Sequence, residues 1–371
     1  MSLPPESSRS SASPSPSIQD ATPSGLASSL HSGRIWPTHT PALFAAAVQR
    51  AGELLRAGEV VALPTETVYG LAADARNERA VARIFELKGR PAHNPIIVHV
   101  SGVEMARRCA AEWPEAADRL AAAFWPGPLT LVVPRASALP GIVTAGGPTV
   151  GLRSSAHPLM HAVIRECGFP LAAPSANRAN QLSPTTALHV ESAFGAQLPL
   201  IVDGGACQVG IESTVVDLTV SPWRVLRPGM IHGGALRAAL GSGPVDEIAP
   251  QPGPDDVLRS PGQLKTHYAP RAKLLVRTWR DEADLKAQVA ALEGRVGGCF
   301  VLAHTVIPSG SEWGGISVIP HDPEAYARAL YGELHRCDAA GAEWIVVETV
   351  PDEPEWHGIA DRLRRASGGQ S

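Results

Sequence analysis

The stretch LPTETVYGLAADARNERAVARIFELKGRPAHNPIIVHV, residues 63–100, decides how the rest of the chain is interpreted. An apolar run at 60–63 predicts a buried strand, and hydroxyl groups gather just beyond its end at 64–67. Residues 77–87 carry apolar side chains at helical spacing, and Asn77 is a suitable N-cap for that helix. The stretch therefore predicts a strand, a polar loop and a helix in succession.

Two cations follow this helix and lead into a second strand. Lys88 and Arg90 flank a glycine, and a proline ends the turn. Residues 96–100, IIVHV, predict a buried strand that carries His99. Guanidinium and ammonium groups bind phosphate and carboxylate oxygens, so the segment predicts an anion site beside a small polar pocket.

These motifs resemble the YrdC-like family of threonylcarbamoyl-adenylate synthases. PTETVYGL and KGRPAHNPIIVHV carry the resemblance first, and further motifs follow in the family's order: WPGPLTLVV, TVGLR, APSAN, SPT, GIESTVVD, LRPG and SPGQLKTHYAP. The last motif marks the long, two-domain form, and the similarity runs from about Ala42 to Ala366. One short motif would be a weak signal, but ordered blocks over most of the chain are specific.

The composition predicts a soluble protein of two domains. The chain has 371 residues, of which 44% are hydrophobic and 18% charged, enough for a large core. Its formal net charge of -4 argues against a bulk electrostatic grip on nucleic acid. No run approaches the roughly 20 apolar residues of a membrane helix. Five widely spaced cysteines without a C-x-x-C pair indicate reduced thiols, so we expect a cytoplasmic protein.

Four segments are expected along the chain. Residues 1–38 are rich in Ser and Pro and predict a disordered extension, with too few arginines to favour a transit peptide. Residues 39–240 mix strands and helices without strict alternation, which predicts an α/β catalytic domain with a mixed, twisted sheet. Residues 241–272 have linker composition. Residues 273–371 alternate regularly and predict a smaller Rossmann-like α/β domain with parallel strands.

Motifs of several other enzyme classes are missing. The sequence has no G-x-x-x-x-G-K-[ST] loop, no H-E-x-x-H or paired cysteine ligands for zinc, and no G-x-S-x-G elbow. Bound ATP would therefore be held by dispersed arginines, hydroxyl groups and backbone N–H groups. Taken singly, an arginine at a strand end is more often solvated or paired with a carboxylate than functional.

The resemblance implies a reaction. L-threonine, bicarbonate (or CO2) and ATP would give threonylcarbamoyl-AMP and pyrophosphate, and the product would feed threonylcarbamoyladenosine modification of tRNA by downstream transferase machinery. The amine of threonine captures CO2 as a carbamate, whose oxygen attacks the α-phosphorus. This displacement requires alignment of two anions and neutralisation of the leaving pyrophosphate by cations and Mg²⁺. It requires no protein nucleophile.

The resemblance also implies the site residues. The L-threonine pocket falls on Thr67, His99, Arg153, Ala173 and Ser213. The ATP site falls on Arg90, Asn94, Thr149, Ser175, Ser183, Arg227 and Tyr268. Lys88 and Arg90 are expected to face the phosphates as the catalytic pair, and Arg153 to bind the carboxylate of threonine beside the small Ala173.

Three side chains of this neighbourhood carry an alternative interpretation. Outside its motif, His99 would be assigned to the core. Tyr69 could pack or line the pocket, and Glu66 could support the metal or cap a loop, so neither is placed in the catalytic set. No protein ligand of a metal is assigned.

Two motifs depart from the family's usual form. SANRAN at 175–180 lacks the Ser-Gly pair that normally follows Asn177, and the middle of SPGQLKTHYAP at 260–270 also varies. In the long form this linker folds back over the active site, which predicts a lid. Deleting residues 260–270 should raise ATP consumption without product, or weaken nucleotide binding.

Two rival functions remain at this point. A double-stranded RNA-binding protein without adenylyl transfer would show binding that falls steeply with salt and would release no pyrophosphate. A carbamoyl-transfer domain of the hydrogenase-maturation kind shares the fold, but such proteins carry an acylphosphatase unit and zinc-finger cysteines that this sequence lacks. The sequence leaves direct tRNA binding and the oligomeric state open.

Overall fold

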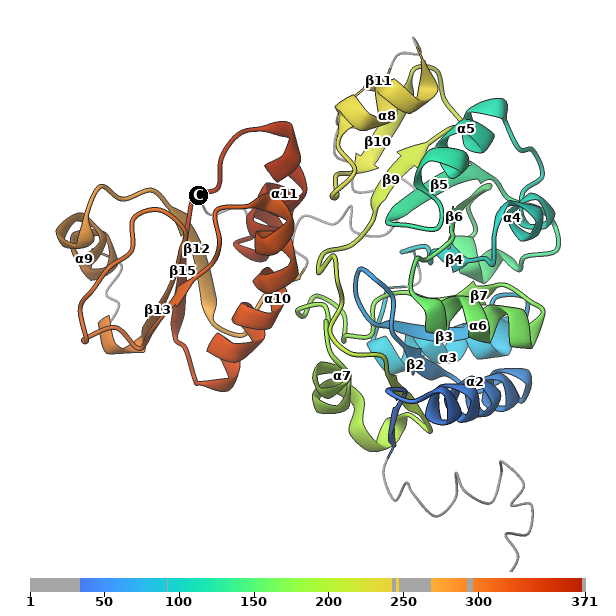
Figure 1. The fold of residues 1–371 in the computed structure, drawn as a ribbon, viewed down its shortest axis with the longest axis horizontal. Helices are drawn as coiled ribbons and strands as arrows, with labels where there is room; N and C mark the ends of the chain where they lie inside the picture. The colour runs from blue at the N-terminus through green and yellow to red at the C-terminus, as the bar shows by residue number, and fades with distance from the viewer. Residues whose placement is uncertain (1–33, 92, 242–244, 247–267, 292–295, 369–371) are drawn as a thin grey trace, which may run out of the picture. The chain divides into compact units, whose positions relative to one another are not determined.

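The computed structural model describes residues 34–91, 93–241, 245–246, 268–291 and 296–368, and these contain two β-sheets (Figure 1). Eleven of the described strands form one sheet in the order β1-β8-β2-β3-β7-β4-β6-β5-β9-β10-β11. They are β1 (Ile35–Pro37), β2 (Val61–Leu63), β3 (Gly70–Asp74), β4 (Val98–His99), β5 (Leu129–Pro134), β6 (Thr149–Arg153), β7 (Leu171–Ala172), β8 (Ile201–Asp203), β9 (Thr214–Asp217), β10 (Trp223–Arg227) and β11 (Val245–Asp246). Parallel and antiparallel pairs alternate irregularly, which confirms the mixed sheet.

Seven helices of the described residues accompany this sheet. They are α2 (Pro41–Arg56), α3 (Glu78–Lys88), α4 (Val103–Cys109), α5 (Glu115–Phe124), α6 (Pro158–Cys167), α7 (Ala187–Phe194) and α8 (Gly233–Leu240), with short 3-10 turns at Gly141–Thr144 and Gly195–Gln197. All but α4 and α8 lie where the apolar periodicity predicts a helix. Asn77 caps α3 as expected, because its Oδ1 accepts from the backbone N–H groups of Arg79 and Ala80. Helices α2 and α6 lie side by side (Figure 1).

The second sheet is built from the last hundred residues. Its strands β12 (Lys273–Arg277), β13 (Cys299–Ala303), β14 (Gly315–Val318) and β15 (Trp344–Glu348) run in the order β12-β15-β13-β14, and every pair is parallel. Helix α9 (Glu282–Ala290) follows β12, α10 (Pro323–Ala339) connects β14 to β15, and α11 (His357–Ala366) follows β15. Short 3-10 turns precede β13 at Val296–Gly298 and α11 at Pro354–Trp356. The parallel α/β unit expected here is confirmed.

Some elements differ from the expectation. Residues 35–37 were assigned to the disordered extension, but they form β1, where Ile35 pairs with Ile201 of β8 in parallel register. Strand β4 is shorter than the predicted 96–100, because the N–H of Ile96 donates to the carbonyl of Val143 in a 3-10 turn. Strand β3 (GLAAD) was not foreseen, since glycine, alanine and aspartate have low strand propensity.

Contacts join the two sheets into one unit, residues 33–371. An apolar cluster combines Val68 and Ile211 of the first part with Tyr326 and Tyr331 of α10. The end of the expected linker returns to the first part, because the N–H of Ala269 donates to the carbonyl of Asn180 at 3.0 Å. Most of the expected lid, residues 260–267, lies outside the described residues. Among the helices that the structure describes, none has the length and apolar character that crossing a membrane requires.

Candidate functional site

A small polar cavity of about 40 Å³ opens where loops leave strands β2, β4, β6 and β7. Its lining comprises Thr65, Thr67, Val68, Tyr69, Gly70, Arg90, Ile97, His99, Arg153, Ala173, Pro174, Ser175, Glu212, Arg227 and Tyr268. Cavities that enclose drug-sized ligands usually measure ~300 Å³ or more. Lining side chains must therefore move apart before a nucleotide can enter.

Arg153 stands at the end of β6, opposite His99 on the neighbouring strand β4. Its Nη2 lies 2.8 Å from Oε1 of Glu66, but the two atoms are not aligned as a hydrogen bond. The contact is a close, buried ion pair between the guanidinium and the carboxylate. The other oxygen of Glu66 accepts from the hydroxyl of Ser155.

Glu66 is a carboxylate that the site keeps charged. Burial raises its pKa, but the nearby charge of Arg153 and the hydroxyl of Ser155 outweigh burial and bring the pKa to about 2. Because its charge is matched by Arg153, Glu66 acts in this structure as the partner of that arginine. The role in metal support considered from the sequence stays untested, because the structure shows only the protein partners of Glu66.

His99 is a buried histidine with an unused nitrogen. Its Nδ1 has no hydrogen-bond partner among the residues that the structure describes. Burial, and then the charge of Arg153, lower its pKa to about 3, so the imidazole is neutral at physiological pH. His99 is one of the lining residues of the cavity, and an unpaired buried nitrogen is uncommon in folded proteins.

Arg90 is held rigidly at the edge of the cavity. Its Nε donates to the carbonyl of Asn94 at 3.0 Å, and its Nη2 donates to Oδ1 of Asn94 and the carbonyl of Pro95, both at 2.7 Å. These bonds leave Nη1 uncommitted within the described residues. Burial lowers the pKa of Arg90 to about 10, which keeps the guanidinium charged at neutral pH.

Arg227 is fixed from two sides. Its Nε donates to the carbonyl of Ser213 and its Nη2 to the hydroxyl of Ser213, both at 3.0 Å. Its Nη1 lies 3.4 Å from the hydroxyl of Tyr268. Tyr268 is almost fully buried and has a φ of 64°, a backbone conformation that tyrosine seldom adopts. The end of the expected linker therefore brings a strained tyrosine directly to the cavity.

Lys88 does not line the cavity in this structure, and its expected contact with the phosphates stays a prediction. Its Nζ donates to the carbonyls of Ser175 and Asn177, both at 2.5 Å, and to Oδ1 of Asn177 at 3.3 Å. The end of α3 points at this loop, so the ammonium supports the loop from behind and does not line the cavity. Lys88 is a positioning residue for Ser175.

The remaining expected residues divide into two groups. Thr67, Ala173 and Ser175 line the cavity together with the residues above. Asn94, Ser183 and Ser213 lie just behind it, where Asn94 holds Arg90, Ser183 donates to Glu212 at 2.5 Å, and Ser213 holds Arg227.

Thr149 is not brought to the cavity. It begins strand β6, whereas Arg153 ends that strand, so about 13 Å of extended chain separates the two residues.

The sequence interpretation missed Glu212, which lies within the GIESTVVD motif and lines the cavity. No local pattern in the sequence indicated a role for Glu212, because its partners Ser183, Tyr331 and Arg362 are distant in the chain.

Tyr69 has both of the roles considered from the sequence. Its side chain lines the cavity, and its hydroxyl donates to the carbonyl of Gly205 at 2.7 Å within the packed interior. Within the described parts of the chain, no three His, Cys, Asp or Glu side chains gather as a metal site.

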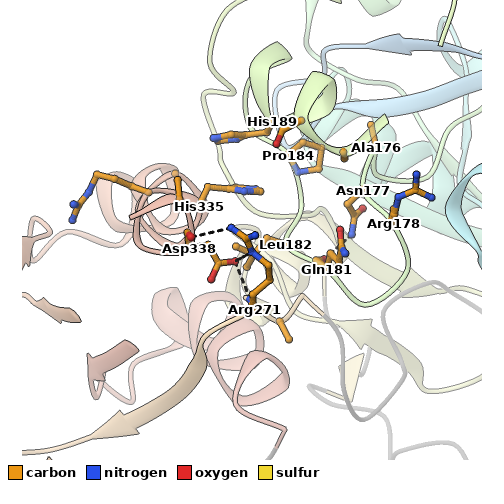
Figure 2. Close-up of a pocket in the computed structure, with 16 residues that line it drawn as sticks. Ala176, Asn177, Arg178, Gln181, Leu182, Pro184, His189, Arg271, His335 and Asp338 are labelled. Atoms are coloured by element: carbon orange, nitrogen blue, oxygen red, sulfur yellow. Dashed lines mark hydrogen bonds and ion pairs between the residues drawn. The ribbon is translucent and has the colours of Figure 1, made fainter. Parts of the chain in front are cut away.

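A larger cavity of about 490 Å³ lies apart from this chemistry (Figure 2). It is bordered by the 176–184 loop, by α7 and by α10. His189 and His335 stack in it with ring centres 3.8 Å apart, and Arg271 is bonded to Asp338. None of the expected site residues lines this cavity, so size alone does not identify the functional site here.

The burial of the site arginines bears on the RNA-binding alternative. Arg90, Arg153 and Arg227 are 8%, 4% and 2% exposed. A duplex meets a protein through its outer phosphates, which side chains at this depth do not reach. Their arrangement suits a small anionic ligand that enters the cavity.

We expect the free energy of unfolding to fall as the pH drops below about 6.5, the ordinary histidine value. In the folded state burial lowers the pKa of His99 to about 3 and that of His189 to about 4. Above pH ~6.5 both states are neutral, and below it only the unfolded chain binds the proton, so each group removes up to about 1.4 kcal/mol per pH unit. Denaturant unfolding between about pH 7.5 and about pH 5 measures this slope.

The control for that slope uses the half-buried His189 and the exposed His39. His189→Gln should make the dependence on pH shallower, because it removes one of the groups that protonate only on unfolding. His39→Gln, at an exposed position, should leave the slope as in the wild type. A stability that stays constant over this range would contradict the assignment of neutral buried imidazoles.

Comparisons with known proteins cover nearly the whole chain. Residues 53–229 match the Sua5/YciO/YrdC family model, described as telomere recombination, and residues 231–368 match the model of the threonylcarbamoyl-AMP synthase C-terminal domain. The threonylcarbamoyl-AMP synthase of Pyrococcus abyssi is 39% identical over 327 residues, which cover 86% of this chain and 94% of that protein. The Bacillus subtilis threonylcarbamoyl-AMP synthase is 45% identical over 230 residues, 62% of this chain and 66% of the relative.

A solved structure shows the same fold. The crystal structure of P. abyssi Sua5 complexed with L-threonine superposes with a TM-score of 0.82 at 35% identity, and the match covers 91% of this chain and 97% of the other. A doubly substituted variant of that protein gives a TM-score of 0.81 at the same identity, over 91% of this chain and 96% of the other. The similarity extends over both sheets.

Proposed function

This chain belongs to the threonylcarbamoyl-AMP synthase family in its long, two-domain form and is an enzyme, and we propose that it joins L-threonine, bicarbonate (or CO2) and ATP into L-threonylcarbamoyl-AMP. The observation that carries the proposal is one cavity lined by Arg90, Arg153 and Arg227 beside the neutral His99. Three guanidinium groups in so small a space suit a ligand pair with several negative charges.

The amino acid is proposed to bind at Arg153. Two parallel N–H donors of a guanidinium match the two oxygens of a carboxylate, and Arg153 lines the cavity. Ala173 leaves space beside it, and the hydroxyl of Thr67, 2.9 Å from that of Thr65, offers a polar contact for the side chain of threonine. The neutral imidazole of His99 lines the same pocket.

ATP is proposed to bind at Arg90 and Arg227, with Mg²⁺ entering as the companion of the triphosphate. The amine of threonine and bicarbonate give a carbamate and water. A carbamate oxygen then forms a bond to the α-phosphorus, while the bond from that phosphorus to the bridging oxygen breaks and pyrophosphate leaves with the electron pair. Positioned guanidinium groups stabilise the charge that develops on the leaving group.

This chemistry assigns binding and alignment to the protein and no covalent step. The described lining residues include the neutral His99 and no activated nucleophile, and Glu66, which is not a lining residue, is held in an ion pair with Arg153. Holding the carbamate against the triphosphate lowers the entropic part of the barrier. The product would pass to the tRNA threonylcarbamoyl-transferase machinery in the cytoplasm.

The proposal is tested by pyrophosphate release with ATP, bicarbonate and a panel of amino acids. We expect release that requires both bicarbonate and L-threonine, and that falls by roughly 10- to 200-fold with analogues lacking one methyl group. Arg90→Ala should abolish release, whereas Arg50→Ala, at an exposed position of α2, should release as the wild type does. Release that is indifferent to threonine would defeat the proposal.

A further inference from the structure

We propose that Arg362 of α11 is a positioning residue for the ATP site. Its guanidinium binds Glu212 and keeps this carboxylate from pairing with the arginines that hold the triphosphate. The inference rests on the proposed function, because it assigns ATP to Arg90 and Arg227. It gives the C-terminal α/β unit a defined part in nucleotide binding, although none of its own helices lines the cavity among the described residues.

Arg362 reaches Glu212 through more than one bond. Its Nε donates to Oε2 of Glu212 at 2.6 Å, and its Nη2 donates to the backbone carbonyl of the same residue at 3.0 Å. Its Nη1 donates to the carbonyl of Pro228 at 2.9 Å, directly after Arg227 in the chain. The side chain is 1% exposed. A buried arginine of this kind requires a paired negative charge, because an unpaired charge in the interior is strongly destabilising.

Glu212 requires a countercharge because it is a buried carboxylate at the edge of the proposed ATP site. It lines the cavity together with Arg90 and Arg227, and its Oε1 accepts from the hydroxyl of Ser183. The hydroxyl of Tyr331 in α10 adds a bond of 3.2 Å to Oε2. Both carboxylate oxygens are therefore fixed by groups that lie outside the cavity.

The electrostatic consequence concerns the triphosphate. A buried carboxylate beside a polyanion site repels the ligand and competes for its arginines, since interactions are strong in a poorly hydrated interior. Arg362 supplies the countercharge of Glu212, so that this carboxylate competes less with phosphate for Arg90 and Arg227. Asp361 lies on the outer side of Arg362, at 3.0 Å from its Nη1, and is itself shared with Arg364 and Arg365.

The backbone holds α11 close to the site. A Cβ placed on Gly358, at the start of α11, would lie 2.9 Å from the backbone of Gly229. Helix and loop therefore touch main chain to main chain, four residues before Arg362 and two after Arg227. This contact fixes the distance over which Arg362 reaches Glu212.

The test compares Arg362→Met, Glu212→Gln and the double variant with wild type in the full chain. The measurements are Mg-ATP affinity by titration, the KM for ATP and for threonine, and the thermal midpoint. We expect Arg362→Met to weaken ATP binding by about tenfold or more, with the KM for threonine within about threefold of wild type. The double variant should return to within about threefold of Glu212→Gln alone, because no unmatched charge remains.

Two further variants keep the test decisive. Arg364→Met removes a half-exposed cation two residues away in α11, and it should leave ATP affinity unchanged. If Arg362→Met does not fold, Tyr331→Phe removes only one hydroxyl from Glu212 and should weaken ATP binding by about two- to fivefold without loss of folding.

The outcomes separate this inference from the proposed function. A wild-type protein that binds no ATP defeats the proposed function, and the inference with it. A wild type that binds ATP, beside Arg362→Met or Tyr331→Phe variants with unchanged affinity, overturns the inference alone. A double variant that recovers thermal stability but not ATP affinity would also overturn it, because Arg362 would then serve the fold and not the charge of the site.

Discussion

Replacing Arg153 with methionine should lower kcat/KM for L-threonine by about 10²- to 10⁴-fold while the affinity for ATP stays within about threefold. A bidentate guanidinium–carboxylate pair comprises two charge-assisted hydrogen bonds of about 1.5–3 kcal/mol each. Loss of both corresponds to about 3–6 kcal/mol, and each 1.36 kcal/mol is about tenfold in rate. Steady-state pyrophosphate release at varied threonine measures the effect.

Glu66 requires a companion variant in that experiment. Arg153→Met leaves the carboxylate of Glu66 buried without its countercharge, which destabilises proteins by about 3–5 kcal/mol. Arg153→Met with Glu66→Gln should regain most of the stability and none of the threonine activity. If the double variant used threonine as well as the wild type does, Arg153 would serve only to neutralise Glu66.

The second large effect is expected at Gly210, two residues before Glu212. Gly210→Ala should lower the free energy of unfolding by about 3 kcal/mol, because alanine at a φ of 86° costs about 1–2 kcal/mol and overpacking adds about 1–3 kcal/mol. The new Cβ would lie 2.4 Å from the carbonyl oxygen of Ala327, which is backbone of α10 and cannot rotate away. Denaturant unfolding gives the change in midpoint.

Gly332 is the matched control for that substitution. It lies in the same helix α10, and a Cβ there would meet nothing within 4 Å. Gly332→Ala should keep or raise stability by up to about 1 kcal/mol, because alanine is the better helix former. Equal behaviour of the two variants would show that α10 is not packed against the backbone of Gly210.

The sequence was sufficient for elements with a strong local signal. The sequence predicts a strand at 149–153 and helices at 323–339 and 357–366, and β6, α10 and α11 have these bounds. Helices α4 and α8 and strands β1 and β3 lack such signals. Strand β1, for example, contains only three residues and exists through its pairing with β8, which is more than 160 residues away.

In the site, too, local motifs identify residues, whereas contacts between distant segments cannot be predicted from the sequence. Motifs located Arg90, Arg153 and Arg227, and the structure places all three around one cavity. Motifs could not tell that Lys88 turns to the carbonyls of Ser175 and Asn177, because that depends on where α3 ends relative to a loop 87 residues later. Long-range partners of this kind are fixed by packing and leave no pattern in the neighbouring sequence.

The same reason explains why the sequence indicates no role for the C-terminal unit beyond holding the linker. Arg362 and Glu212 are 150 residues apart, so no local pattern connects them. Their ion pair becomes visible only once α11 is docked. The expected lid at 260–270 stays a prediction, because only Tyr268, Ala269 and Pro270 of that stretch are described.

The central claim is that one cavity binds the amino acid through Arg153 and the nucleotide through Arg90 and Arg227. A structure of this chain with L-threonine and a non-hydrolysable ATP analogue measures it most directly. The account predicts the carboxylate of threonine on the guanidinium of Arg153 and the phosphates on those of Arg90 and Arg227. Threonine or phosphates bound instead in the larger cavity between α7 and α10 would contradict it.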